Sequence, residues 1–284
     1  DTITAGAGKF MKTYHGPEFR LSARYAFTDN FSVKAGFNSM RQYIHKLSNT
    51  VIMSPTDTWK LSDVNIKPQR GWQAAAGLYL NSPSSIWEYS VEGYYKRMSD
   101  YLDYRGGAKL LMNHHIETDV INTQGHAYGV ELQVKKQVGK LNGWMSYTYS
   151  RTFLRQNDKR IEKPVNNGDW YPTEYDKPHD FKFVGNYKFT HRYSMSINVD
   201  YSTGRPTTIP AGQYYDESTQ SMRVYYTERN SYRIPDYFRT DISFNIEPSH
   251  HLTLLTHSSI SIGVYNVTGR KNVYSIYYLS LIHI

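Results

Sequence analysis

The sequence lacks cysteine and any long apolar run, and each absence excludes a class of protein. Without cysteine the chain can form neither a disulfide scaffold nor a zinc–thiolate site, and it has no cysteine nucleophile. No stretch approaches the roughly 18 apolar residues of a membrane-spanning helix, and the mean hydropathy is −0.64. Hydropathy alone suggests a soluble protein. A transmembrane β-barrel escapes this test, because only alternate residues of each strand face lipid.

The motifs of enzymes and of nucleic-acid-binding proteins are also missing. We find no glycine-rich phosphate loop, no Gly-x-Ser-x-Gly elbow and no carboxylate pair tied to a histidine, so we expect neither enzymatic activity nor a cofactor. The formal charge is +8, but lysine and arginine are scattered singly instead of forming a basic run. We therefore expect no nucleic-acid partner, and interpret the charge as decoration of a lumen and of loops, useful towards anionic lipid headgroups or an anionic ligand.

Aromatic residues, in contrast, are abundant. With 27 Tyr, 11 Phe and 5 Trp they make up 15% of the chain. This content suits a barrel with an aromatic girdle at each bilayer interface. An aromatic-rich core of a soluble β protein is the alternative interpretation.

The connections between strand-like segments alternate between short and long. Compact polar turns fall at 28–30, 81–85, 138–142, 190–192 and 248–251, and long polar segments at about 48–70, 105–125, 156–177 and 204–236. Short turns at one end of a sheet and long loops at the other are typical of an outer-membrane β-barrel. A soluble sandwich has little reason to sort its loops so strictly by length.

Most segments between these connections alternate between apolar and polar residues, which predicts strands with two different faces. The clearest are 18–27, 31–38, 86–97, 127–136, 180–189, 193–201 and 238–247, and the weaker ones are 2–12, 72–80, 143–153, 257–267 and 273–278. The sequence therefore predicts an all-β protein with about eleven or twelve strands in an antiparallel transmembrane β-barrel.

The two faces of these strands are expected to meet different surroundings. The apolar faces Phe19–Phe27 and Tyr193–Tyr201 begin and end with aromatic rings, about 25 Å apart, close to the height of a lipid-facing band. The opposite face carries charges, as expected of a wet lumen. We expect a lumen-facing charge network of Arg20, Arg24, Lys34, Glu92, Asp180, Lys182, Arg239 and Asp241.

Five stretches of the C-terminal half resemble the barrel of TonB-dependent outer-membrane receptors, especially those of the Bacteroidota. They are YDKPHDF (175–181), YSTGRP (201–206), RIPDYFRTD (233–241), VYNVTGRKN (264–272) and YSIYY (274–278), the last resembling a closing strand. Together these stretches are fairly specific, whereas each one alone is weak. Their residues are expected to build the barrel and not to contact the ligand.

The resemblance implies a 22-stranded barrel occluded by an N-terminal plug, and energised import of a scarce nutrient driven by the inner-membrane TonB complex. The chain starts at Asp1 without an initiating methionine or a signal peptide. We therefore expect residues 1–278 to be the C-terminal portion of the barrel. The plug, the remaining strands and the TonB-contacting segment would then lie in a missing N-terminal part.

Residues 279–284 break the alternation and differ from the usual end of the family, where the last strand closes the protein with an aromatic residue. We predict a non-native tail after Tyr278. A simple longer strand is the alternative.

Aromatic and basic residues in the long segments are the candidates for ligand binding, because rings with polar neighbours stack on sugars or on a flat chelate. They are Trp59, Trp170, Tyr171, Tyr214, Tyr215, Tyr225, Tyr226, Arg223 and Arg229. Packing of loops and girdles is the alternative for the rings. The arginines could equally contact lipopolysaccharide phosphates.

No metal site is expected. His114 and His115 lie near Glu117 and Asp119, but adjacent side chains of a strand point to opposite faces. The pair His250–His251 has still less support. Asp158, Asp169, Glu174 and Asp176 lack the spacing of a calcium loop.

The leading hypothesis is therefore the C-terminal barrel portion of a TonB-dependent receptor in a Gram-negative outer membrane, taking up a siderophore, cobalamin or an oligosaccharide. Its expected surroundings are outer-membrane lipid and lipopolysaccharide. A passive porin or a surface-adhesive barrel is the main alternative. A soluble carbohydrate-binding β domain is a weaker one.

Overall fold

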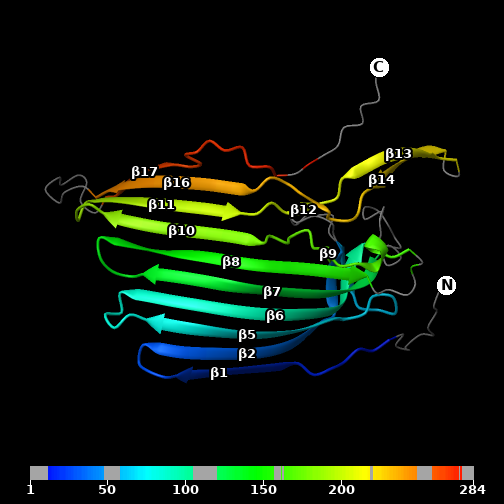
Figure 1. Ribbon diagram of the computed structural model, residues 1–284, viewed down its shortest axis with the longest axis horizontal. Coiled ribbons are helices and arrows are strands. Elements are labelled where there is room, and N and C mark those ends of the chain that lie inside the picture. Colours follow the sequence, from blue (N-terminus) through cyan, green and yellow to red (C-terminus); the bar gives the residue numbers. More distant parts are fainter. Residues whose placement is uncertain are drawn as a thin grey trace, which may run out of the picture.

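The computed structural model describes residues 12–47, 58–104, 120–156, 161, 163–217, 220–247, 258–274 and 276. One broad antiparallel sheet occupies most of them, and its strands lie side by side from β1 at one edge to β17 at the other (Figure 1). The described helical structure is a single 3₁₀ turn, η2 (Val165–Gly168). Within the described ranges no helix has the length and apolarity needed to span a bilayer.

The main strands pair in the order in which the chain visits them. They are β1 (Phe19–Ala26), β2 (Phe31–Gln42), β5 (Gln69–Asn81), β6 (Trp87–Tyr104), β7 (Val120–Lys136), β8 (Leu141–Gln156), β10 (His179–Lys188), β11 (Tyr193–Ser202), β16 (Tyr237–Ile246) and β17 (Ile260–Val264). Each is antiparallel to the next, and the two-residue strand β9 (Tyr171–Pro172) also pairs with β8. The prediction of an all-β antiparallel architecture is confirmed.

Three small two-stranded sheets lie within or beside the long connections. They are formed by β3 (Ile44–Leu47) with β4 (Thr58–Leu61), by β12 (Pro206–Thr207) with β15 (Tyr232–Arg233), and by β13 (Pro210–Asp216) with β14 (Ser221–Tyr226). The last two lie at the end of the sheet opposite the short turns, and β13 and β14 project beyond it (Figure 1).

Four of the predicted short turns are found close to their expected positions, between β1 and β2, β5 and β6, β7 and β8, and β10 and β11. The turn predicted at 248–251 lies outside the described residues. The long segment predicted at 105–125 is shorter than expected, because β7 already begins at Val120 and extends the sheet past the apolar band. Neighbouring β6 is equally extended, with 18 residues.

Two other strand predictions have different outcomes. Of the predicted strand 273–278, the described residues Val273, Tyr274 and Ile276 are not in a strand, so this prediction is wrong for them. The backbone carbonyl of Tyr274 instead accepts a hydrogen bond of 2.8 Å from Arg205. The predicted strand 2–12 is described only at Lys12, and residues 279–284 lie outside the described ranges.

The register joins the apolar positions into continuous rows across the sheet. One row begins at Tyr25, opposite Val33, and ends at Phe238. In order along the sheet it contains Tyr25, Val33, Leu78, Val91, Leu132, Tyr147, Phe181, Tyr201 and Phe238. A face this uniformly apolar on every strand matches the lipid-contacting surface of an outer-membrane barrel.

The described sheet has two edges. All eight residues of β1 are exposed, and within the described residues β1 pairs only with β2 and β17 only with β16. Backbone groups at a sheet edge are not tolerated in lipid. Closure of the barrel therefore requires pairing beyond the described strands.

Candidate functional site at the long-connection end of the sheet

Four of the stretches that resemble receptor barrels, 175–181, 201–206, 233–241 and 264–272, meet at the end of the sheet where the long connections lie. Buried Asp176 is the first meeting point: its carboxylate forms a salt bridge with Arg233, and it accepts hydrogen bonds from Arg151 Nε at 3.3 Å and from the Thr152 N–H at 2.7 Å. Arg233 also donates to the backbone carbonyls of Asp176 and Gly204 at 2.7 and 2.9 Å. The connection between β8 and β10 is thereby fixed to the end of β15.

Asp236 is the second meeting point. Its carboxylate accepts hydrogen bonds from the Gly204 N–H at 2.8 Å and from the Tyr201 hydroxyl at 2.7 Å. These hydrogen bonds, the Gly204 N–H first, hold the pKa of Asp236 below its usual range. Arg270 donates to the backbone carbonyl of the same residue at 2.8 Å. The ends of β11, β16 and the segment after β17 are joined in this way.

A third network connects β6 to the longest connection. Arg229 donates to the Asp103 carboxylate and to the Tyr104 carbonyl, both at 2.6 Å, and the Tyr171 hydroxyl donates to the same carboxylate at 2.5 Å. The Asn166 side chain accepts from the Arg229 N–H at 2.7 Å. This ion pair therefore joins Asp103 and Arg229, which are 126 residues apart in the chain.

Burial shapes the ionisation of this third network. Burial, followed by the negative charge of Asp103, raises the pKa of the Tyr171 hydroxyl, which keeps it a neutral donor. Burial and the same carboxylate also raise the pKa of Glu174. Burial by itself lowers the pKa of Arg229, but Asp103 and Tyr171 outweigh this and leave it raised. The network is thus a fixed support with a permanently charged arginine.

The hairpin β13–β14 carries most of the candidate ligand residues. Its register places Tyr214 opposite Arg223 and Tyr215 opposite Met222, so both faces of the hairpin carry tyrosine. Tyr214, Tyr215, Tyr225 and Tyr226 are all more than half exposed. These rings form an exposed aromatic surface at the long-connection end.

The remaining candidate ligand residues divide into exposed and buried ones. Trp59 is exposed, and Trp170 is exposed with its ring edge-to-face on His126 at 4.3 Å. Tyr171 is 1% exposed and Arg229 is engaged by Asp103. The structure therefore places Tyr171 and Arg229 in the support below the surface.

All eight residues of the predicted lumen charge network share the polar face of the sheet. One row across the strands holds Arg24, Lys34, Glu92 and Asp180. Lys182 and Arg239 flank Asp200 in another row, and Arg20 lies on β1 opposite Asn38. Ion pairs join Lys182 with Asp180 at 3.8 Å and Arg239 with Asp241 at 2.8 Å.

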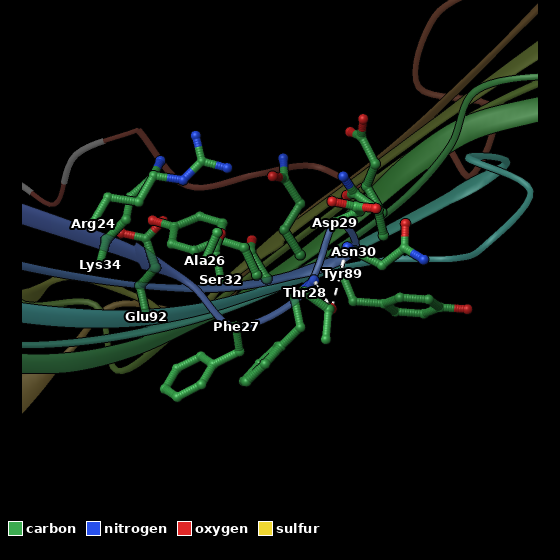
Figure 2. A pocket seen from close by; sticks show the side chains of 16 residues that line it. Arg24, Ala26, Phe27, Thr28, Asp29, Asn30, Ser32, Lys34, Tyr89 and Glu92 are labelled. Carbon is green, nitrogen blue, oxygen red and sulfur yellow. Dashed lines mark hydrogen bonds between the residues drawn. The ribbon is translucent and has the colours of Figure 1, made fainter.

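Arg24, Lys34 and Glu92 line an open hollow of about 630 Å³ near the turn between β1 and β2. Figure 2 shows them on one side of the strands, with the ring of Phe27 on the other. The Tyr79 hydroxyl donates to Glu92 at 2.6 Å. Lys34 Nζ lies 4.2 Å from the centroid of the Tyr79 ring. The hollow is therefore polar and is walled by opposite charges.

The residues considered for metal binding give no cluster in the described part of the chain. His114, His115, Glu117, Asp119, Asp158, His250 and His251 lie outside the described residues. Among those described, no group of three or more histidine and carboxylate side chains could hold a metal ion. Asp176, considered for calcium, is neutralised by arginine instead.

The sequence does not reveal the roles that Asp103, Asn166 and Asn230 have in these networks. Asn166 has a positive φ of 49°, and the side chain of Asn230 donates to the Pro172 carbonyl at 2.8 Å. The available signal was the Asn-Asn-Gly run of 166–168, since asparagine tolerates the left-handed conformation and bonds its neighbours in tight turns. For Asp103, which continues a strand, the sequence offers no such signal.

Comparison with solved structures shows the same fold in outer-membrane receptors. The ferripyoverdine receptor of Pseudomonas aeruginosa matches 88% of this chain with 29% of its own length, at 13% identity and a TM-score of 0.54. The ferric-catecholate import receptor Fiu of Escherichia coli K12 matches 88% of this chain with 30% of its own length, at 13% identity and a TM-score of 0.54. The FrpB iron transporter of Neisseria meningitidis matches 89% of this chain with 35% of its own length, at 12% identity and a TM-score of 0.54. The chain thus spans about a third of the length of these receptors.

Comparison with family descriptions covers nearly the whole chain. No curated protein sequence matches it, but residues 1–267 match the family described as TonB dependent receptor-like, beta-barrel. That family consists of receptors and transporters of the outer membrane and not of enzymes. The register, the connection lengths and this match agree, and the chain belongs to the TonB-dependent receptor-like β-barrel family.

Proposed function

We propose that this chain is the C-terminal barrel portion of a TonB-dependent receptor of the Bacteroidota type that imports a scarce nutrient across the outer membrane. Family membership supports the receptor class. Because the chain spans about a third of the solved receptors, the transport activity belongs to the proposed whole protein, with its plug, its remaining strands and its TonB-contacting segment.

The observation that carries the proposal is the exposed aromatic surface of β13–β14. Four tyrosines more than half exposed, at the end that bears the long connections, can stack on a large ligand with flat or hydroxylated parts. A siderophore, cobalamin or an oligosaccharide fits this description. Trp59, Trp170 and Arg223 are the further contacts proposed, the arginine for an anionic chelate or for lipopolysaccharide phosphates.

Rigid support beneath the hairpin strengthens this assignment. Arg229, which forms an ion pair with Asp103, lies three residues after the end of β14, and the Thr227 N–H donates to the Ile209 carbonyl at 3.1 Å at the base of the hairpin. Binding surfaces held by ordered neighbours lose less freedom on binding. Tyr171 and Arg229 are thus proposed to position the surface instead of contacting the ligand.

An uptake assay in cells that express the complete receptor tests the proposal. Labelled ferric siderophores, cobalamin and oligosaccharides are offered with and without a functional TonB complex. We expect that uptake of one of these three ligand classes requires TonB. Uptake that persists without TonB would support the passive-porin alternative.

Hairpin variants test the ligand surface separately. Replacing Tyr214, Tyr215, Tyr225 and Tyr226 with alanine is expected to weaken binding at least about tenfold, since each stacked ring contributes about 0.5–1.5 kcal/mol. The control Gln213→Ala with Met222→Ala changes the same hairpin but leaves its tyrosines. Equal loss in both variants, or no loss in the first, would contradict the assigned surface.

A further inference from the structure

Two neighbouring short turns carry a group of basic side chains, here named the basic rim. It consists of Lys136 and Lys140, which flank the turn between β7 and β8, and of His191 and Arg192 in the turn between β10 and β11. The two turns are adjacent, because the N–H of Lys188 at the end of β10 donates to the Lys140 carbonyl at 2.7 Å. Two strand spacings, about 10 Å, separate β8 from β11.

Little in the described part of the chain neutralises this rim. Lys140, His191 and Arg192 are exposed, and no described carboxylate forms an ion pair with them. Glu88 beside the first turn forms an ion pair with Lys135, and Glu247 lies beside the second turn, its N–H donating to the Arg192 carbonyl at 2.8 Å. Two lysines and an arginine against one glutamate leave the rim positive.

The other described short turns differ from it. The turn between β1 and β2 contains Asp29, and the turn between β5 and β6 contains only serine, proline and isoleucine. Among the described short turns, basic residues within the turn itself are therefore found only in this sector of the sheet. If basic residues were spread over all the short turns, this uneven distribution of positive charge would not arise.

The rim lies where a bilayer surface is expected. Along β10 the apolar face runs from Phe181 to Phe189, about 26 Å at 3.3 Å per residue, which matches a lipid-facing band of about 25 Å. Phe189 and Tyr193 at the end of this band are exposed, and Arg192 follows directly beyond it. Basic side chains at this depth reach the headgroups while apolar neighbours contact acyl chains.

Lys136 lies at the boundary between the lipid headgroups and the acyl chains. It shares the apolar face with Val134, and its Nζ lies 5.5 Å from the centroid of the Trp87 ring. Trp87 and Leu141 beside it are exposed apolar side chains. An ammonium held against an aromatic ring at the interface is placed to meet a lipid phosphate above its acyl chains.

We propose that the basic rim binds the phosphate of an anionic phospholipid in the leaflet that faces the short turns. Lysine and arginine form charge-assisted hydrogen bonds to phosphate oxygens, and Leu141, Phe189 and Tyr193 provide the contact for the acyl chains. Short turns of outer-membrane barrels face the periplasm. The bound lipid is therefore a phospholipid of the periplasmic leaflet and not lipopolysaccharide.

The test compares lipid retention by native mass spectrometry. The complete receptor that contains this chain, purified from outer membranes in a neutral detergent, is mixed with equal amounts of phosphatidylglycerol and phosphatidylethanolamine. The rim variant is Lys136→Gln/Lys140→Gln/Arg192→Gln. The control Arg20→Gln/Lys96→Gln/Lys182→Gln removes the same charge from the polar face of the strands. A heat-modifiable band on electrophoresis verifies that each variant is folded.

Wild type and control are expected to retain phosphatidylglycerol in preference to phosphatidylethanolamine. The rim variant is expected to bind phosphatidylglycerol at least about tenfold more weakly, because each basic residue near a surface contributes about 1 kcal/mol towards anionic lipid. Where the triple variant fails to fold, the single variant Arg192→Gln serves, with a smaller loss in the same direction.

Four results would overturn the proposal. Equal retention of the two lipids by the wild type would show that the rim does not select charge. Equal loss in rim and control variants would show a nonspecific effect of net charge. Lipopolysaccharide copurifying with the wild type and lost from the rim variant, or release of the lipid by millimolar inorganic phosphate, would assign the rim to another source of phosphate.

Discussion

The carbonyl oxygen of Ile234 lies against Gly204 so closely that a Cβ on this glycine would stand 1.7 Å from it. The obstacle is backbone and cannot rotate away, so Gly204→Ala is expected to lower the free energy of unfolding by at least about 3 kcal/mol. Urea titration of the refolded protein measures this free energy of unfolding. Gly212→Ala is the matched control, with no atom within 4 Å and an expected change within about 0.5 kcal/mol. Similar values for both would contradict this packing.

Removing the arginine partner of buried Asp176 gives a second prediction. Arg233→Met leaves the Asp176 carboxylate, which is 0% exposed, with Arg151 as its remaining charged partner. We expect a loss of about 3 kcal/mol in the free energy of unfolding. Lys135→Met breaks an exposed ion pair with Glu88 and should cost less than about 1 kcal/mol. The prediction fails if the two costs are alike.

The lowered pKa of Asp236 predicts a pH dependence of stability with a definite sign. A carboxyl whose pKa is lower in the folded than in the unfolded chain contributes stability above its unfolded value of about 3.9, and this contribution is lost as the pH falls through the folded pKa. The free energy of unfolding of the wild type minus that of Asp236→Asn should be constant near neutral pH. It should shrink on acidification below about pH 4. A difference independent of pH would contradict the assigned hydrogen bonds.

The two faces of β11 predict opposite tolerance to charge. Ile197 belongs to the apolar face and pairs with Ile242, whereas Asn198 belongs to the polar face and pairs with Asp241. Ile197→Arg should destabilise by about 2–4 kcal/mol in a lipid-supported folding titration. Asn198→Arg should be far milder. Equal effects would show that the faces are assigned wrongly.

The sheet could be predicted from the sequence because every strand repeats the same contrast between lipid and water. Alternation around Phe19–Phe27 and Tyr193–Tyr201 fixes both the strand and its two faces, and short polar turns fix the hairpins. A weak segment such as 273–278 failed, since a few alternating residues do not decide between a strand and a segment held by side chains. Its Tyr274 carbonyl accepts from Arg205 instead.

The long-connection end could be predicted only in part. Resemblance drew attention to Asp176, Arg233 and Asp236, but not to which residue each contacts. The polar neighbours of Tyr171 suggest an exposed ring, but the structure buries it in pairing with Leu154 of β8, with its hydroxyl bonded to Asp103, 68 positions away. Pairings over such separations depend on the register of the intervening strands, which a single sequence does not display.

Cysteine labelling of cells tests the orientation of the sheet in the outer membrane. The chain contains no cysteine, so Tyr225→Cys on the β14 hairpin and Ser84→Cys in the turn between β5 and β6 each introduce a single thiol into it. Intact cells expressing the receptor are treated with a membrane-impermeant maleimide. We expect labelling of Tyr225→Cys at once, and of Ser84→Cys only after the outer membrane is permeabilised. The reverse pattern, or labelling of both in intact cells, would contradict it.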